Sequence, residues 1–433
     1  MSRDTSGGQA GTLSGDAEGA IAVELRSPIR VAIIDIAEPL RDLDCTRQEE
    51  PPYTGAWILV CDSGYPLGSI EIPLAGTLIT AAELKHELQR HFSGTRSPVD
   101  RDAEFALPRI SVVIPSNLAR VDQLRRCVAR MTELDYPDYE VIVVDNRRGK
   151  VPPVDVPGAR VVREPQPGIS AARNRGIAVA TGEIVIFTDD DVVPSRQWLR
   201  AIAERFAHEP DAAAVTGLMV PLELETDAQI LFEQSGSGPD RAYKPLSFRR
   251  SSHFRVVRRS IEDGTEQAGS LYKTGEFGLG SNMAFRTSVL RGMGGFDVAL
   301  GVGTPAPAGD DLALFIELLS AGHRIAYEPS AITQHCHRAT VPELEQQIHA
   351  YGIGFTAMLT AIIVRNPRHL LGLASVLPEW LGSMRNHSTA KQLHRPVEYP
   401  PSLARAELWG MLLGPLAYLR SRWVHRAGRR WPS

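Results

Sequence analysis

The clearest pattern in this chain is a short apolar run that ends in a cluster of acids. Residues 184–187 are entirely apolar, and Asp189, Asp190 and Asp191 follow after a single threonine. An apolar run of this length predicts a strand buried on both faces, as in a parallel sheet. Because ligands of open α/β sheets gather at the carboxyl ends of the strands, we expect the three acids at the mouth of a cleft.

Adjacent acids have two explanations. They repel one another unless a cation neutralises them, and hard cations such as Mg²⁺ or Mn²⁺ prefer carboxylate oxygens and bridge to phosphates. Acid runs are also common in solvated loops. The preceding segment favours the first explanation, because the alanine-rich residues 169–180 predict a helix between Gly168 and Gly182 that leads into the strand. Asp189 and Asp191 are therefore candidates for handling a metal-bound diphosphate.

A related pattern begins the same domain. Residues 110–115 and 140–145 are apolar runs, and residues 121–131 between them have apolar positions at helical spacing. This order predicts a βαβ unit and a parallel sheet. Asp145 then lies at the same sheet edge as Asp189, where an acid commonly contacts a nucleotide, although a helix cap is the alternative. No glycine-rich loop follows the first strand, which disfavours a dinucleotide enzyme or a P-loop ATPase.

The amino-terminal part has a different pattern. Thr80 and Glu83 form a capping box before a helix with one apolar face. Three segments alternate between apolar and polar positions and predict half-buried strands; they lie near residues 29–33, 57–61 and 70–74. We expect a small β-rich module here, and nothing in it indicates catalysis.

The later part of the large domain mixes weak and strong patterns. Residues 235–275 are polar and weakly patterned, which predicts a long loop, either a lid or a disordered insertion. Residues 277–286 then pass through glycines into a strand-like segment. Asp310 and Asp311 stand at the start of an apolar-periodic helix, where the helix dipole stabilises carboxylates. Capping is one explanation; a deprotonated carboxylate facing a cleft also suits a general base.

Two histidines follow the last predicted strand. His335 and His337 are two residues apart, so on a strand they share a face. One imidazole could complete a metal site, and a structural histidine is the alternative.

Composition narrows the function. The 433 residues are 43% hydrophobic with a net charge of −4, so a large core is expected and general attraction to nucleic acid is not. The cysteines, at positions 45, 61, 127 and 336, lack paired spacing and indicate reduced thiols in a cytoplasmic protein. We expect neither a signal peptide in residues 1–20 nor a transmembrane helix, since no run of about 18 apolar residues occurs.

The carboxyl-terminal part is apolar and basic. Residues 353–364, 370–377 and 408–419 are apolar segments too short to span a bilayer. Arginines surround the last segment, against the single acid Glu407; they are Arg405, Arg420, Arg422, Arg426, Arg429 and Arg430. This predicts either helices at an anionic membrane surface or a helical layer packed on the large domain with a solvated basic tail.

Taken together, residues 109–338 resemble the family 2 glycosyltransferases, enzymes of the GT-A fold. The matching motifs occur in order at residues 112–116, 143–145, 172–176, 189–191, 280–286, 294–297 and 310–311 and at His335. The acidic pair is Asp-Asp here, where the family usually has Glu-Asp. With its β-rich amino-terminal module, the chain is similar to a group of bacterial, especially actinobacterial, members.

The resemblance implies an α/β fold class: a GT-A (Rossmann-like nucleotide-diphospho-sugar transferase) domain, a small amino-terminal α+β module and a carboxyl-terminal helical region. The expected organisation is residues 1–24 disordered, 25–95 the module, 96–108 a linker, 109–340 the GT-A domain and 341–433 the helical, membrane-associated or packed region.

The resemblance also implies roles for individual residues. Asp311 would be the general base, beside Asp310. Nucleotide and donor contacts would come from Pro115, Asp145, Arg173, Asn174, Asp189 and Asp190. A Mn²⁺ or Mg²⁺ ion would be held by Asp189, Asp191 and His335. The acceptor side would include Gly280, Asn282, Arg286 and His337.

The implied reaction is an inverting transfer from a nucleotide-diphosphate sugar to an acceptor hydroxyl. The resemblance favours a UDP-sugar, with GDP- and dTDP-sugars as alternatives, and an acceptor that is an envelope glycan, a lipid-linked sugar or a small molecule. Cytoplasmic or peripheral location at the inner face of the plasma membrane is expected. The alternatives are a catalytically silent nucleotide-sugar-binding scaffold, which would not need Asp191 or Asp311, and a nucleotidyltransferase, which would want a basic glycine-rich loop after the first strand.

Overall fold

The computed structural model describes residues 27–93, 107–234, 243–385 and 400–425. The expected disorder of residues 1–24, most of the linker at 96–108, and Arg426, Arg429 and Arg430 lie outside the described residues.

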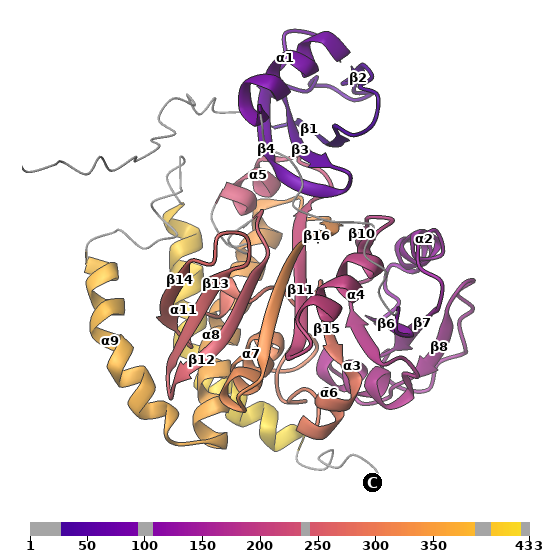
Figure 1. The fold of residues 1–433 in the computed structure, drawn as a ribbon. Helices are drawn as coiled ribbons and strands as arrows, with labels where there is room; N and C mark the ends of the chain where they lie inside the picture. Colours follow the sequence, from indigo (N-terminus) through magenta and orange to yellow (C-terminus); the bar gives the residue numbers. More distant parts are fainter. Residues whose placement is uncertain (1–26, 94–106, 235–242, 386–399, 426–433) are drawn as a thin grey trace, which may run out of the picture.

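A mixed sheet forms the middle of the molecule (Figure 1). In spatial order its strands are β14 (Glu266–Ser270), β13 (Arg255–Ser260), β12 (Leu246–Ser252), β16 (Arg324–His335), β11 (Ala212–Pro221), β15 (Met283–Arg286), β9 (Ile184–Phe187), β6 (Ile110–Ser116), β7 (Tyr139–Asp145) and β8 (Arg160–Arg163). The short β10 (Val192–Pro194) pairs with β16. Strands β9, β6, β7 and β8 run parallel, and β15 is antiparallel to both β9 and β11.

Helices cover both faces of the sheet because its central strands are buried at every position. In β6, Val112 belongs to the hydrophobic cluster that contains residues of α2 (Val121–Met131) and α4 (Trp198–His208). The next residue, Val113, belongs to the cluster that contains residues of α3 (Ile169–Val179) and α7 (Asp310–Ser320). The short α6 (Thr287–Met293) lies on the second face too. The predicted βαβ unit and buried strand are therefore confirmed, and β6, β7 and β9 end at one edge.

The amino-terminal module docks onto the large domain at this carboxyl edge (Figure 1). It contains β1 (Ile29–Asp35), β2 (Leu43–Asp44), β3 (Gly55–Asp62), β4 (Tyr65–Pro73), β5 (Leu78–Ile79) and α1 (Ala81–Phe92), the last with the predicted Thr80–Glu83 capping box. One face of its sheet packs on α1, and the other joins the core of the large domain through side chains such as Trp57. Arg47 and Tyr53 both bind Glu225, at 2.8 and 2.6 Å.

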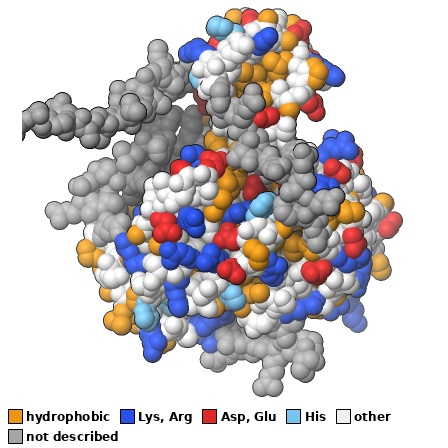
Figure 2. Space-filling view, in the orientation of Figure 1, with side chains coloured by type: hydrophobic (Ala, Val, Ile, Leu, Met, Phe, Trp, Pro, Cys, Tyr) orange, Lys and Arg blue, Asp and Glu red, His pale blue; other side chains and the backbone are white. Residues whose placement is uncertain are grey.

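The prediction of a long loop at residues 235–275 is wrong for the residues described there. They form the antiparallel strands β12, β13 and β14 at the edge of the sheet. These strands have few buried apolar residues, such as Phe248 and Val256, and polar residues occupy consecutive exposed positions, so the usual alternation of an antiparallel sheet is missing. Among the arginines of these strands, Arg249 pairs with Glu266 at 3.2 Å. Figure 2 shows the mixed basic and acidic surface over these strands.

The helices after β16 form further layers. Helix α8 (Val341–Arg365) packs on α7, and α9 (His369–Arg385) and α11 (Pro401–Val424) pack on α8. The apolar segment at 353–364 thus belongs to a 25-residue helix, and by length and composition alone α8 could cross a membrane. The expectation that every apolar segment is too short was wrong for α8, because polar residues at its start extend the helix.

Helices α8 and α11 run in the same direction and approach very closely. His349 Nδ1 lies 2.9 Å from the Ala406 carbonyl, and Thr356 Oγ1 donates to the Met411 carbonyl at 2.7 Å. A Cβ on Gly410 would lie 2.2 Å from the His349 carbonyl oxygen, and one on Gly352 would lie 2.2 Å from the Glu407 carbonyl oxygen. Only glycine permits this backbone contact.

We predict that Gly410→Ala destabilises the protein, although alanine normally favours a helix over glycine by about 1 kcal/mol. The new methyl group must push two backbones apart, which costs about 1–3 kcal/mol. Denaturant unfolding measures the change. Gly292→Ala in α6, where a Cβ meets nothing within 4 Å, is the matched control and should be neutral or stabilising. Equal effects of the two substitutions would contradict the close packing.

Candidate functional site

The first acid cluster follows β9 at the carboxyl edge of the sheet. Ligand atoms of Asp189, Asp191 and His335 all lie within 4.8 Å of one another. The pairing of β10 with β16 causes this arrangement, because it places Val192 opposite His335 and so brings the end of β16 beside Asp191. Asp190 turns the other way and accepts a hydrogen bond from Ser116 Oγ at 2.5 Å.

Of the three acids, Asp191 has two basic side chains beside its carboxylate. His335 Nε2 lies 3.3 Å from its Oδ1, and Arg120 Nη2 donates to its Oδ2 at 3.3 Å. Burial raises the pKa of this carboxyl, but His335 and Arg120 outweigh burial and hold it below the usual value. Burial raises the pKa of Asp189 and of Asp190, and in both the charge of Asp191 adds to the rise.

These residues fit a divalent cation. Carboxylate oxygens and an imidazole nitrogen are ligands that Mn²⁺ accepts. Two of the atoms at the cluster are buried without a bond of hydrogen-bond geometry in the described part of the chain. They are His335 Nδ1 and Asp191 Oδ1, and the latter has only the ion-pair contact with His335 Nε2 at 3.3 Å. Buried polar atoms are normally paired, so this cluster is a candidate acidic metal site.

The second cluster is at the start of α7. Asp311 Oδ2 accepts from the Gly280 amide and its Oδ1 from the Leu312 amide, both at 2.8 Å. Burial and the neighbouring charge of Asp310 raise the pKa of Asp311 to about 6. A carboxyl with that pKa is deprotonated at neutral pH and still a good proton acceptor.

Arg173 joins the two clusters. Its Nη1 binds Asp310 Oδ2 at 2.5 Å, its Nη2 binds the Gly280 carbonyl at 3.0 Å, and the same nitrogen lies 3.9 Å from Asp189 Oδ1. The guanidinium is buried, and its carbon lies 5.3 Å from the centre of the Phe296 ring. The charge of Arg173 thus offsets one acid that follows strand β9, Asp189, and another at the start of helix α7, Asp310.

The predicted nucleotide contacts lie at the neighbouring part of the same edge. Asp145 is at the end of β7, opposite Ser116 in β6, and Pro115 precedes Ser116. Arg147 donates to both carboxylate oxygens of Asp145, at 3.0 and 2.8 Å, and Arg163 Nη1 donates to Oδ1 at 3.0 Å. Burial alone would raise the pKa of Asp145. The hydrogen bonds from Arg147 lower the pKa by more than burial raises it, so the net shift is downward. A nucleotide at Asp145 would therefore meet these arginines.

The structure does not bring every predicted residue to the acid clusters. Asn174 binds the backbone of Phe296 with both its amide atoms, at 2.9 and 2.8 Å. Asn282 is fully buried and bonds to Trp198 Nε1 and to the carbonyls of Leu218 and Ala331. The Asn174 amide therefore holds the turn at Phe296, and the Asn282 amide ties strand β11 to strand β16.

Two further predicted acceptor-side residues lie elsewhere. Arg286 pairs with Ile184, the first residue of β9, so it sits at the edge of the sheet opposite the acids, where it donates to the Ala212 carbonyl. His337 is buried against Glu233, to which its Nε2 is bonded. Its ring centre is 5.6 Å from that of His335. Gly280, in contrast, lies at the second cluster.

Arg120 and Ser116 were not among the predicted site residues. Both follow or end the first strand of the domain, and each contacts one of the three acids. Only their positions in the sequence could have indicated them. Ser116 ends strand β6 and Arg120 follows it closely, and β6 ends at the same edge of the sheet as the strand before the acids.

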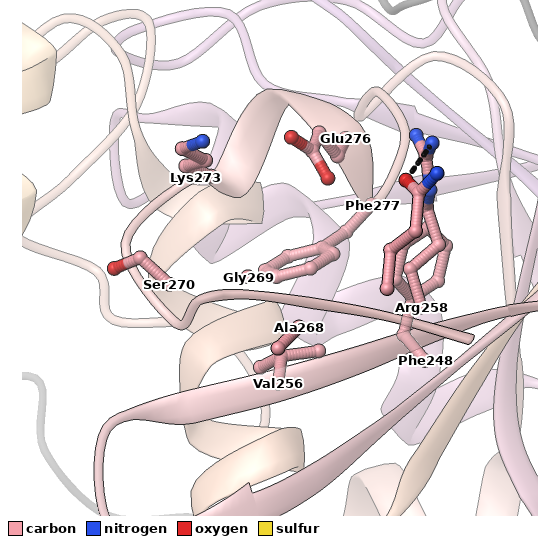
Figure 3. A pocket seen from close by; sticks show the side chains of 10 residues that line it. Phe248, Val256, Arg258, Ala268, Gly269, Ser270, Lys273, Glu276 and Phe277 are labelled. Carbon is pink, nitrogen blue, oxygen red and sulfur yellow. Dashed lines mark hydrogen bonds between the residues drawn. The ribbon is translucent and has the colours of Figure 1, made fainter.

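A separate cavity of about 200 Å³ lies in the edge part of the sheet. It lies between β13, β14 and the short η1 (Thr274–Glu276), and Figure 3 shows Lys273 and Glu276 at its rim. Phe277, at its floor, is followed directly by the loop whose Gly280 binds Asp311. None of the acids described above lines this cavity.

The mixed sheet, with helices on both faces and an acid cluster after a central strand, agrees with the GT-A fold class expected from the sequence. Residues 111–290 match the model of glycosyl transferase family 2. The chain therefore contains a domain of glycosyl transferase family 2.

Several proteins are similar to this chain. A pre-mycofactocin glycosyltransferase of Mycobacterium tuberculosis is 30% identical over 313 residues, which are 68% of this chain and 57% of the relative. A glucosyl-dolichyl phosphate glucuronosyltransferase of Haloferax volcanii is 26% identical over 172 residues, 39% of this chain and 47% of the relative. The chain thus spans about half the length of these curated relatives.

Among solved structures, a mannosyltransferase from Pyrobaculum calidifontis in complex with GDP-Man and Mn²⁺ is 16% identical. It has a TM-score of 0.39 and covers 81% of this chain and 84% of its own.

We predict that Arg173→Ala lowers the free energy of unfolding by about 3–5 kcal/mol, because it leaves Asp310 buried without its cation. Denaturant unfolding at neutral pH measures the loss. Arg175→Ala, an exposed arginine on the same helix, should change stability by no more than about 0.5 kcal/mol. An Arg173→Ala protein as stable as wild type would show that the guanidinium does not balance the two clusters.

Proposed function

We propose that this protein is an inverting, divalent-metal-dependent glycosyltransferase that moves a sugar from a nucleotide-diphosphate donor to an acceptor hydroxyl. The observation that carries the proposal is the joining of the two acid clusters by Arg173. One cluster offers metal ligands, and the other offers a carboxylate with a pKa near 6. A transferase of this kind needs both functions close together.

The donor would bind along the edge formed by the ends of β6, β7 and β9. Asp189, Asp191 and His335 would hold Mn²⁺ or Mg²⁺, which when bound supplies positive charge to the departing diphosphate. Asp145 and Pro115 would lie against the nucleoside, and Arg147 and Arg163 keep Asp145 ionised.

The acceptor would approach Asp311. Its carboxylate takes the proton of the acceptor hydroxyl, the oxygen forms a bond to the anomeric carbon, and the bond from that carbon to the diphosphate breaks. This single displacement inverts the anomeric configuration. The amides of Gly280 and Leu312 fix both oxygens of Asp311, and Arg173 holds Asp310 beside it.

The family resemblance favours a UDP-sugar as donor, with GDP- and dTDP-sugars as alternatives. The name of the Haloferax relative contains a dolichyl phosphate-linked sugar, which supports a lipid-linked acceptor; an envelope glycan or a small molecule is the alternative. Either setting fits a protein in the cytoplasm or at the inner face of the plasma membrane.

The rival is a scaffold that binds a nucleotide sugar without reacting. A screen separates the two: purified protein is incubated with a panel of UDP-, GDP- and dTDP-sugars and Mn²⁺, and nucleotide release is measured. Release from one donor, lost in Asp311→Asn but with binding retained, supports transfer chemistry. Tight donor binding without release, even with acceptor extracts, supports the scaffold.

We predict that the rate of transfer rises with pH through about 6, because the base must be deprotonated and the pKa of Asp311 is raised to about 6. Asp310→Asn removes the neighbouring negative charge and should lower this pKa, so the acidic limb of the profile should move to lower pH. Asp311→Asn should reduce turnover by about 10² or more and leave donor affinity unchanged. Two results would contradict Asp311 as the base. One is a pH–rate profile that does not shift in Asp310→Asn, and the other is a larger loss of turnover in Asp310→Asn than in Asp311→Asn.

A further inference from the structure

Helix α11 presents a continuous apolar face to the outside of the molecule. Its large exposed apolar residues recur at intervals of three and four and so lie on one side of the helix. They are Leu408, Trp409, Leu412, Leu413, Leu416, Leu419, Trp423 and Val424, with exposed fractions between 45% and 72%. Surface residues this apolar are ordinary when single, but a contiguous row of eight marks an interaction surface.

The opposite side of α11 explains why this face is available. Leu403, Gly410, Gly414 and Tyr418 are buried against α8 and the large domain. Tyr418 also donates to Asp297 Oδ2 at 2.9 Å, in the turn that carries Phe296. The helix is therefore fixed to the catalytic domain, and the exposed face is not a by-product of loose packing.

The more hydrophobic helix, α8, does not offer an equivalent surface. Ile348, Ala357, Met358 and Ile362 of α8 are buried within the protein, and a Cβ on Gly354 would overlap Ala308. Placing α8 across a bilayer would require these contacts with the large domain to be broken. Hydropathy alone selects the wrong helix.

Charge identifies the partner of the α11 face. Arg405 and Arg420 are exposed and lie on the same side as the apolar row, one near each end. Arg422 instead lies over the ring of the buried Tyr418, on the inner side of the helix. The one acid of α11, Glu407, is only partly exposed, and its carbonyl packs on Gly352. A second copy docked face to face would bring arginine near arginine, whether the two helices ran parallel or antiparallel. An anionic lipid surface instead satisfies both the apolar row and the cations.

We propose that α11 lies in the plane of an anionic membrane surface, with its apolar face in the headgroup–acyl boundary and Arg405 and Arg420 at the phosphates. The apolar row from Leu408 to Val424 is roughly 24 Å long at 1.5 Å per residue. Because the other side of α11 is packed on the protein, the helix can meet a membrane only by lying flat on it. Trp409 and Trp423 would sit at the interface, where tryptophan side chains are favoured. The inference goes beyond the proposed transfer reaction and does not depend on it.

Sedimentation with vesicles tests the proposal. The full chain should pellet with POPC–POPG vesicles at low salt and much less with POPC alone. Leu412→Glu/Leu416→Glu should weaken binding to POPC–POPG by at least about ten-fold. Leu78→Glu, at an apolar residue 50% exposed on the amino-terminal module, is the matched control and should bind like wild type. Unchanged melting temperatures and soluble nucleotide release separate lost membrane binding from misfolding and from lost catalysis.

Fluorescence and extraction complete the test. Binding should shift tryptophan emission to the blue, and Trp409→Phe/Trp423→Phe should remove the shift; alkaline carbonate should release the protein from vesicles. Wild-type protein that stays in the supernatant, or resists carbonate, overturns the proposal. So does a dimer in light scattering that Leu412→Glu/Leu416→Glu converts to monomers, because the occupant of the face would then be a second copy.

Discussion

The arrangement of the site depends on one buried guanidinium. Arg173 reaches Asp310, the Gly280 carbonyl and the neighbourhood of Asp189, so it fixes the start of α7, the glycine loop and the end of β9 relative to one another. Without it, two groups of carboxylates would face each other across a poorly solvated space. The same constraint sets the chemistry, because Arg173 opposes the rise in the pKa of Asp311 that burial and Asp310 cause, leaving it near 6.

The elements that position this site were predictable because their sequences carry strong local signals. Continuous apolar runs located β6, β7 and β9, and the apolar period of 3.6 located α2, α4 and α7. The strand ends then implied that Asp145, Asp189 and Asp191 share an edge. The strands β12–β14 were missed because they contain few buried apolar residues and several consecutive exposed polar ones, so they lack the alternation that normally marks an antiparallel strand. The pairing of His335 with Asp191 needed the β10–β16 register, which no local pattern encodes.

Motif membership was a poorer guide to the role of single side chains. Asn174 and Asn282 lie in motifs next to the site, yet their amides are used to hold backbone segments. Arg286 is three residues from the site end of β15, which is enough to place it at the far edge of the sheet. The carboxyl-terminal helices show a similar contrast: length and hydropathy select α8 as a membrane span, whereas one side of α8 is packed on the large domain and α11 exposes the longer apolar row. In each case the tertiary contacts decide what the side chain can do.

The central claim is that the acids after β9 and His335 hold a metal that binds the donor diphosphate. Calorimetry of UDP and of the donor found by screening, with and without Mn²⁺, tests it most directly. The account predicts affinity that depends strongly on Mn²⁺ in the wild-type protein and weak, metal-independent affinity in Asp191→Ala, with the same melting temperature. Equal affinity with and without Mn²⁺ in the wild-type protein would contradict it.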